Sequence, residues 1–303
     1  MRYNKKSTAS LKSTNVALQY RKQSRANMLW RQFKKNKGAV SGLVLIVVII
    51  LIAVASNFIW DYDTQITGMN SLERLLSPSL SHPFGTDHMG RDVLARVCYG
   101  ARYSLLIGFS AVSISMIFGA IIGSIAGYYG GRVESIIMRI VELFLMIPAI
   151  LLVIIFVSVF GTSLLNLIIG LGASTIPHFA RNARASVMTV RGSEFVEAAK
   201  AVGASDLRII FDHVLPNAFS PILVQATTRI ASCIIDAAAF SFLGLGVPAP
   251  LPEWGAMLAD ARQFLRDHPN LTVAPGVAIM LTVFAVNLIG DGLRDALDPK
   301  LKK

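Results

Sequence analysis

Long apolar runs without a charged side chain alternate with shorter polar segments along most of the chain. A helix needs roughly 20 apolar residues to cross the hydrocarbon core of a membrane. The predicted crossings are residues 38–60, 103–131, 219–244 and 271–290, with two more inside residues 143–180 and a turn between those two at 161–163. The pattern therefore predicts an all-α fold, a polytopic membrane helical bundle with six transmembrane helices.

Two features inside these runs predict how the spans pack. Gly119, Gly123 and Gly127 recur at every fourth residue. Such a ridge of small residues lets two helices approach closely where lipid supplies no hydrophobic drive between them. The second span is therefore expected to pack tightly inside the bundle, and Pro148 is expected to kink the third span.

Composition and charge agree with a membrane protein. The 303 residues are 53% hydrophobic and only 16% charged, with a formal net charge of +11. Residues 1–37 contain eleven Lys or Arg and no acidic residue, so this tail accounts for the whole excess. Basic segments next to a span favour the cytoplasmic side, which predicts that both termini are cytoplasmic. Contact with anionic membrane lipid is a further interpretation of the tail, whereas nucleic acid is discounted because no folded reading element accompanies it.

The chain lacks the residue patterns of a catalytic or metal site. Cys98 and Cys233 lie far apart and the five histidines are scattered, so neither a disulfide nor a metal site is predicted. No Gly-x-x-x-x-Gly-Lys-Ser/Thr motif occurs, so the chain cannot hold ATP phosphates in a loop of its own. It is not expected to be an enzyme or to bind a cofactor, and any ATP and Mg²⁺ would be bound by partner subunits.

Four polar residues in or near the spans are candidates for a translocation path. Arg229 and Asp236 lie two turns apart in the fifth span, Glu142 lies at the inner end of the third, and Asn287 lies near the inner end of the sixth. Charges in a span usually face the bundle interior or an aqueous cavity. The alternatives are that Arg229 and Asp236 serve assembly with a partner, or that they form the ion path of a secondary transporter or channel together with Glu142.

Two polar segments are expected on the outer side of the membrane. In residues 61–102, Asp87 precedes Arg91 and Asp92 precedes Arg96 by four residues, which predicts an amphipathic surface helix. Residues 245–270 contain Pro248, Pro250 and Pro252 followed by Glu253 and Trp254. This second segment is either a rigid lip that docks a partner protein or a turn at the membrane surface. The candidate docking residues are Asp87, Arg91, Asp92, Glu253 and Trp254.

Residues 193–217, the polar hairpin, separate two of the apolar runs. Its Glu197-Ala198-Ala199 triplet is followed by Gly203 and, further on, by Leu215-Pro216-Asn217. Small residues allow close contact with another surface, Gly203 permits a turn, and Pro216 is expected to stop the second helix. The segment is therefore predicted to dock another protein.

The chain resembles the second permease subunit of dipeptide, oligopeptide and nickel ABC importers. The polar hairpin is similar to the loop that couples such permeases to their ATPases. The other similar segments are residues 82–87 (HPFGTD), 90–93 (GRDV), 99–102 (YGAR), 242–246 (FLGLG), 252–258 (PEWGAML) and 287–299 (NLIGDGLRDALDP). Seven segments in order along the chain are far more specific than any one of them.

The resemblance implies a complete importer in a prokaryotic cytoplasmic membrane. Its partners would be a homologous permease, two ATP-binding subunits and an extracytoplasmic binding protein. Peptides are the favoured substrate, with glutathione and nickel chelates as alternatives, and a scaffold without transport activity is a third class. The expected divisions are a basic cytoplasmic tail (1–37), a first span with an outer loop (38–99), a permease core (100–296) and a cytoplasmic C-terminus (297–303).

Overall fold

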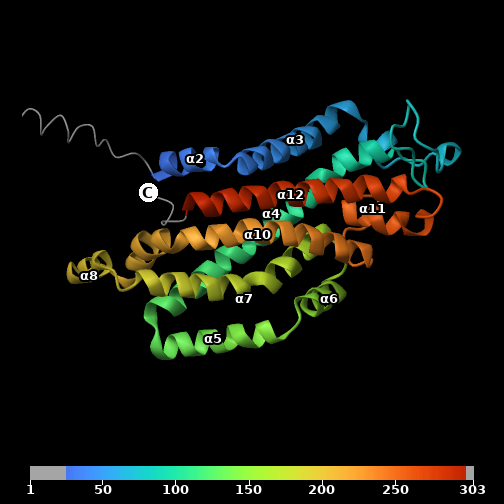
Figure 1. Ribbon diagram of the computed structural model, residues 1–303. Helices are drawn as coiled ribbons and strands as arrows, with labels where there is room; N and C mark the ends of the chain where they lie inside the picture. Colours follow the sequence, from blue (N-terminus) through green and yellow to red (C-terminus); the bar gives the residue numbers. More distant parts are fainter. Residues whose placement is uncertain (1–24, 298–303) are drawn as a thin grey trace, which may run out of the picture.

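The structure, a computed structural model, describes residues 25–297 as an elongated bundle of helices (Figure 1). No strand occurs among these residues; the one isolated β-bridge pairs Thr86 with Asp92. The tail before residue 25 and the last six residues lie outside this range. The long helices are α2 (Arg25–Lys35), α3 (Lys37–Ile59), α4 (Val93–Tyr129), α5 (Gly131–Met146), α6 (Ala149–Phe160), α7 (Leu164–Val190), α10 (Leu215–Phe242) and α12 (Asn270–Leu297).

The short elements lie at the two ends of the bundle. At one end, α8 (Glu194–Ala201), α9 (Asp206–Arg208) and a π-helical turn, η3 (Ile209–Val214), form the polar hairpin. At the other end are α11 (Trp254–Ala261) and the turns η1 (Tyr62–Ile66), η2 (Ser71–Glu73) and η4 (Arg262–Phe264). Figure 1 shows α2 and the end of α12 at the hairpin end of the bundle. We call the opposite end, residues 61–92 and 245–269, the distal lobe.

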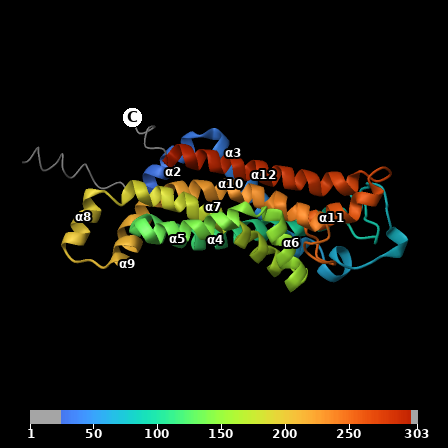
Figure 2. The ribbon, with the colours of Figure 1, turned by 90° about the horizontal axis from the view of Figure 1, so that it is seen from below.

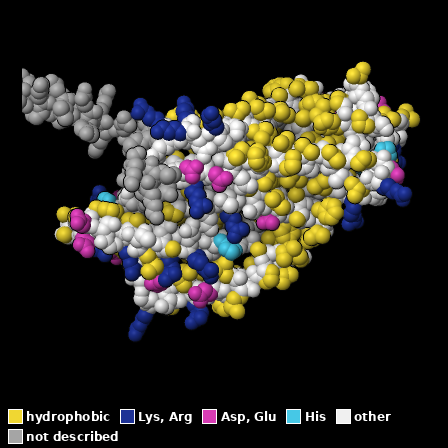
Figure 3. Space-filling view, viewed as in Figure 1, with side chains coloured by type: hydrophobic (Ala, Val, Ile, Leu, Met, Phe, Trp, Pro, Cys, Tyr) yellow, Lys and Arg dark blue, Asp and Glu magenta, His cyan; other side chains and the backbone are white. Residues whose placement is uncertain are grey.

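The predicted membrane bundle is confirmed, with a refinement of its spans. Within residues 25–297, four helices are long and apolar enough to cross a membrane: α3, α4, the continuous segment Asp206–Phe242, and α12. The pair α5 and α6 would make a fifth crossing, bent by 84°. The second of the two crossings predicted inside residues 143–180 corresponds to α7, which is not among these candidate spans; it is 27 residues long and carries Arg181 and Arg184 in its second half. Figure 3 shows apolar side chains over the middle of one face and charged side chains gathered toward the hairpin end.

The glycine ridge of α4 lies directly against α7, and these two helices share the largest contact in the bundle. A Cβ added at Gly123 would lie 2.7 Å from Ala183 Cβ and 2.8 Å from Arg184 N, and one at Gly127 would lie 2.9 Å from Arg184 O. These distances are too short for a methyl group, so the two backbones touch. The expected close packing is confirmed, because 44% of the most apolar 18-residue stretch of α4 is buried in the bundle, compared with 22% of the corresponding stretch of α3.

The break between α5 and α6 follows from Pro148. This residue begins α6 without a backbone N–H, and the residue before a proline disfavours helical backbone, so Ile147 is extended. The expected kink is thus a sharp bend. At the other end of α6, Gly161 has a φ of 85°, and Ser163 caps α7 by accepting a hydrogen bond from Asn166 N at 3.0 Å. The turn at 161–163 is therefore confirmed.

We predict that Gly123→Ala destabilises the helical bundle by about 1–3 kcal/mol, because overpacking a filled contact pushes two helices apart. The measurement is the thermal unfolding midpoint of the purified chain in detergent, which is detected as the loss of soluble, monodisperse protein on heating. Gly276→Ala in α12 is the matched control, since a Cβ there meets nothing within 4 Å. Equal midpoints for the two variants would contradict a packing role for Gly123.

Candidate functional site

The polar hairpin is anchored to the bundle through its apolar inner side. Val196 and Ala199 of α8 are buried, and they pack in one cluster with side chains from the ends of α4 and α7 and from η3. The buried members from those elements are Tyr128, Val187, Ile209, Ile210 and Val214, with Ala218 at the start of α10. The two arms of the hairpin are therefore packed together with the ends of α4, α7 and α10.

Three polar contacts add to this anchor. The Tyr128 hydroxyl donates a hydrogen bond to Asp206 Oδ1 at 2.8 Å, and Lys200 Nζ lies 5.1 Å from the centre of the Tyr128 ring. Arg191 Nη1 donates to the carbonyl of Gly127 at 2.8 Å. The end of α4 thus holds both α8 and α9, although it lies far from both in the sequence.

The outer side of the hairpin is exposed and mixes acidic, small and apolar side chains. Phe195, Glu197 and Ala198 are exposed on α8, and beyond its end Val202 is 84% exposed and Leu207 of α9 is 62% exposed. Figure 2 shows α8 and α9 projecting beyond the ends of the neighbouring helices. An apolar surface on a projecting element with this composition is typical of a protein interface.

Gly203 and Pro216 act differently from the sequence-based expectation. Gly203 has a φ of 78°, which favours glycine, but an added Cβ would meet nothing within 4 Å, so backbone conformation and not crowding requires it. Pro216 does not stop a helix: it lies in the first turn of α10, and the helix runs on from Asp206 to Phe242. The π-helical turn before it, where the Leu215 N–H donates to Ile210 O, accommodates the proline.

A second feature, which we call the basic groove, runs between α7, α10 and α12. It has a volume of about 700 Å³ and is lined by two arginines, five polar side chains and three apolar ones. The lining residues are Asn182, Ser220, Pro221, Val224, Gln225, Thr228, Arg229, Ser232, Arg294 and Leu297. Among residues 25–297, no carboxylate lies within ion-pair distance of Arg229 or Arg294. The groove therefore offers two guanidinium groups to a ligand.

The distal lobe is held together by buried charges. Arg91 is only 2% exposed, and its Nε lies 2.7 Å from Asp87 Oδ2 and its Nη2 3.6 Å from Asp260 Oδ2. Arg96, equally buried, donates to Ile66 O at 2.6 Å and lies 3.6 Å from the same Asp87 carboxylate. These pairs join the segment before α4 to the segment around α11.

Glu253 and Trp254 also connect the start of α11 to α4. Glu253 caps α11, because its carboxylate accepts hydrogen bonds from Gly255 N and Ala256 N at 2.9 Å each and from Ser104 Oγ at 3.1 Å. Trp254 donates from Nε1 to Val97 O at 2.9 Å. Both side chains are 1% exposed. The Pro-rich segment is thus fixed against α4.

Comparisons with known proteins decide the family. Residues 119–303 match the model for the binding-protein-dependent transport system inner membrane component, and residues 24–78 match the N-terminal TM domain of oligopeptide transport permease C. The chain belongs to this inner-membrane permease family. Its predicted resemblance is confirmed.

Curated relatives cover nearly the whole permease. A dipeptide transport system permease protein of Alkalihalophilus pseudofirmus is 48% identical over 90% of this chain and 89% of its own. A di/tripeptide transport system permease protein of Pseudomonas aeruginosa is 43% identical, and a glutathione transport system permease protein of Pectobacterium atrosepticum is 41% identical, each over 90% of this chain and 91% and 90% of their own.

A solved structure supports the fold of the permease core. An inward-facing conformation of the MetNI methionine ABC transporter aligns with a TM-score of 0.56 at 19% identity, over 68% of this chain and 97% of that one. At this identity the likeness concerns the fold alone.

The structure brings some of the predicted residues together. Glu197, Ala198 and Gly203 lie on the exposed side of the polar hairpin and Ala199 on its buried side. Leu215, Pro216 and Asn217 form the first turn of α10, where Asn217 Nδ2 donates to His213 O at 2.6 Å.

Of the path candidates, only Arg229 lines the basic groove. Asp236 and Asn287 are exposed on α10 and α12 but are not among its lining residues. Glu142 lies on α5 and forms an exposed ion pair with Arg139 at 3.8 Å. The four residues therefore do not form one polar track within this subunit.

Two expectations for the distal lobe were wrong. The surface helix does not form: Asp87 and Arg91 pair across a turn, while Asp92 caps α4 and contacts His82 Nδ1 at 2.8 Å instead of Arg96. Glu253 and Trp254 are buried, so their side chains cannot contact a docking protein directly. Local spacing detected the pair of Asp87 and Arg91, but the other partners, Asp260 for Arg91 and Ser104 for Glu253, come from segments distant in the sequence.

Sequence reasoning missed Tyr128, Asp206 and Lys200, which secure the hairpin, and Gln225 and Arg294 in the groove. Tyr128 and Asp206 are 78 positions apart, so no local spacing relates them. The position of Tyr128 at the end of an apolar run was the one available signal, since aromatic residues concentrate where spans leave the membrane.

We predict that Glu253→Ala lowers the stability of the permease by about 2 kcal/mol, because it removes a helix cap and leaves the buried Ser104 hydroxyl without its acceptor. Asp267→Ala, which removes an exposed carboxylate of the same lobe, serves as the control. Thermal unfolding and limited proteolysis within residues 245–269 are the measurements. Wild-type behaviour of Glu253→Ala in both would show that the cap does not hold the lobe.

Proposed function

We propose that this permease forms, with a homologous permease, the membrane path of an ATP-driven importer of dipeptides or oligopeptides. The observation that carries the proposal is the 48% identity to a dipeptide permease over 90% of the chain. A second curated relative that handles di- and tripeptides supports the same substrate class. The glutathione relative fits as well, because glutathione is itself a small peptide that bears carboxylates.

The polar hairpin is the proposed contact for a cytoplasmic ATPase. Its exposed apolar residues would be covered by such a partner, and Glu197 would supply a charged hydrogen-bond acceptor at the contact. Because the inner side packs on α4, α7 and the start of α10, movement of the ATPase would be passed to these helices. This assignment puts the tail, the hairpin and the C-terminus in the cytoplasm, in agreement with the basic residues around them.

The distal lobe is the proposed docking surface for an extracytoplasmic binding protein. Its surface is held in one arrangement, because the buried side chains of Glu253 and Trp254 and the ion pairs of Asp87 fix residues 61–92 and 245–269 to each other and to α4. A preorganised surface loses less conformational entropy when a partner binds. Docking would then use exposed residues of the lobe, while the buried ones maintain its shape.

The basic groove is the proposed part of the path contributed by this subunit. A free peptide carries a C-terminal carboxylate at neutral pH, and a guanidinium group binds a carboxylate through two parallel hydrogen bonds. Arg229, which is half-buried, would meet such a group as the peptide passes, and the Ser, Thr, Asn and Gln side chains of the groove would meet its amide groups.

Uptake of a labelled dipeptide tests the proposal. Proteoliposomes would contain the assembled complex of permeases, ATPases and binding protein, with ATP inside the vesicles. Uptake should require ATP and binding protein and should persist when ion gradients are collapsed. Uptake that follows an ion gradient without ATP would instead establish a secondary transporter, and passive flux would establish a channel.

In the same assay, we predict that Glu197→Ala lowers the rate of dipeptide uptake about tenfold, which corresponds to the loss of one charge-assisted hydrogen bond. Glu194→Ala is the matched control, because both carboxylates are exposed in the first turn of α8, where each interacts favourably with its dipole. Substrate-stimulated ATP hydrolysis should fall with uptake, while the complex still assembles. Equal uptake rates for the two variants would show that Glu197 only stabilises α8 through the helix dipole and does not contact the ATPase.

For the groove, we predict that Ser232→Cys reacts with a membrane-impermeant thiol reagent in at least one state of the transport cycle. The experiment uses a chain in which Cys98 and Cys233 have been replaced. Leu51→Cys is the control, since Leu51 is 61% exposed on the apolar surface of α3 and should remain unreactive. If Ser232→Cys is never labelled, with or without ATP and peptide, the groove is not a water-filled path and Arg229 serves assembly.

A further inference from the structure

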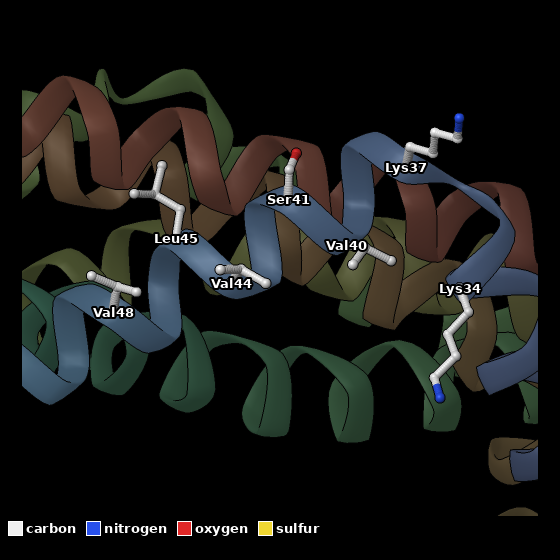
Figure 4. Close-up of a pocket in the computed structure, with 7 residues that line it drawn as sticks. All are labelled: Lys34, Lys37, Val40, Ser41, Val44, Leu45 and Val48. Carbon is white, nitrogen blue, oxygen red and sulfur yellow. The ribbon is translucent and has the colours of Figure 1, made fainter.

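A surface groove where α2 meets α3 combines two cationic side chains with an apolar wall. Lys34 at the end of α2 and Lys37 at the start of α3 stand at one end of the groove, and Val40, Val44 and Val48 continue along α3 at intervals of one turn (Figure 4). The groove has a volume of about 550 Å³. Its polar end and its apolar wall therefore follow the same order as a phospholipid, with the headgroup at one end and the acyl chain beyond it.

The dimensions of the groove match one leaflet of a membrane. Lys37 and Val48 are eleven residues apart, which is about 16 Å along a helix that rises 1.5 Å per residue. Half the thickness of the hydrocarbon core is about 15 Å. In a membrane crossed by α3, its first residue Lys37 would lie at the level of the headgroups, and Val44, which is 58% exposed, would face the acyl region.

The surroundings of the groove favour an anionic headgroup. Arg31, Lys34, Lys35 and Lys37 are all exposed within seven residues that contain no acid. The nearby carboxylate of Asp295 on α12 does not line the groove and accepts a hydrogen bond from Asn36 Nδ2 at 2.9 Å. Trp30, 48% exposed and 4.9 Å from Lys34 Nζ, adds the kind of amphipathic ring that concentrates at the headgroup level.

We propose that this groove binds an anionic phospholipid, with the phosphate between Lys34 and Lys37 and an acyl chain along Val40, Val44 and Val48. In Figure 4 the two lysine side chains point apart, toward opposite edges of the groove. Their four-carbon stems are flexible, so both can turn toward one headgroup. The bound lipid would fix the angle between α2 and α3 at the membrane surface. The site is independent of the transported substrate.

Native mass spectrometry of the full-length chain tests the proposal. The chain is released from micelles that contain equal amounts of phosphatidylglycerol and phosphatidylcholine, and the bound lipids are counted. Phosphatidylglycerol should be retained in preference, and the double variant Lys34→Gln/Lys37→Gln should lower its retention by about fivefold for each lysine removed. Arg31→Gln/Lys35→Gln changes the net charge equally at two neighbouring positions of α2 that do not line the groove, so it should retain the lipid.

A cross-linking experiment identifies the occupant in the assembled complex. A photoreactive amino acid at position 44 should form an adduct with phospholipid in membranes. A cross-link to a protein segment at that position would overturn the proposal, because another chain or the N-terminal tail would then occupy the groove. Equal loss of phosphatidylglycerol from the two double variants, or no preference over phosphatidylcholine, would also overturn it.

Discussion

The contact between the backbones of α4 and α7 is the constraint on which the rest of the structure depends. Lipid offers no hydrophobic drive for helices to associate, so the attraction comes from close packing, and only glycine at positions 119, 123 and 127 allows it. The contact places the end of α4 beside the end of α7. Tyr128 and the Gly127 carbonyl then lie where the polar hairpin needs them, within reach of Asp206 and Arg191.

The two ends of the permease are stabilised in different ways, and the difference suits their surroundings. The distal lobe depends on buried charges, which are strongly unfavourable if one partner is lost and therefore favour a single arrangement. The polar hairpin depends on a small apolar cluster with a few polar contacts, and it leaves large apolar side chains exposed. The exposed apolar side chains of the hairpin indicate that another subunit covers this end, whereas the distal lobe holds its shape through its own contacts.

Much of this fold could be predicted from local patterns. The spans follow from the lengths of the apolar runs, the tight contact from the glycine spacing, and the break between α5 and α6 from Pro148. The hairpin was recognisable because its small residues, Gly203 and Pro216 occur at fixed offsets. The sequence pattern erred at Pro216, because a π-helical turn just before it lets the helix continue.

The remaining features depend on contacts between distant segments, which no local pattern contains. The spacing of Asp87 and Arg91 correctly indicated a pair, but Asp260 and Ile66, which complete the burial of Arg91 and Arg96, come from elsewhere in the chain. Glu253 looked like a surface charge in a Pro-rich loop. Its burial follows from Ser104 and the start of α11, which meet only in the folded lobe. The basic groove likewise needs three helices in place before Arg229 and Arg294 share a surface.

The continuous helical segment from Asp206 to Phe242 reaches from the polar hairpin to the edge of the distal lobe. Its 37 residues span about 55 Å at 1.5 Å per residue. A tilt of only about 10° at the hairpin would therefore displace the far end by roughly 10 Å, on the scale of the width of a helix. The π-helical turn η3 lies near the hairpin end of this helix, and the hydrogen bond from Leu215 N to Ile210 O there spans one residue more than in an α-helix, so this is the point where the helix is least regular.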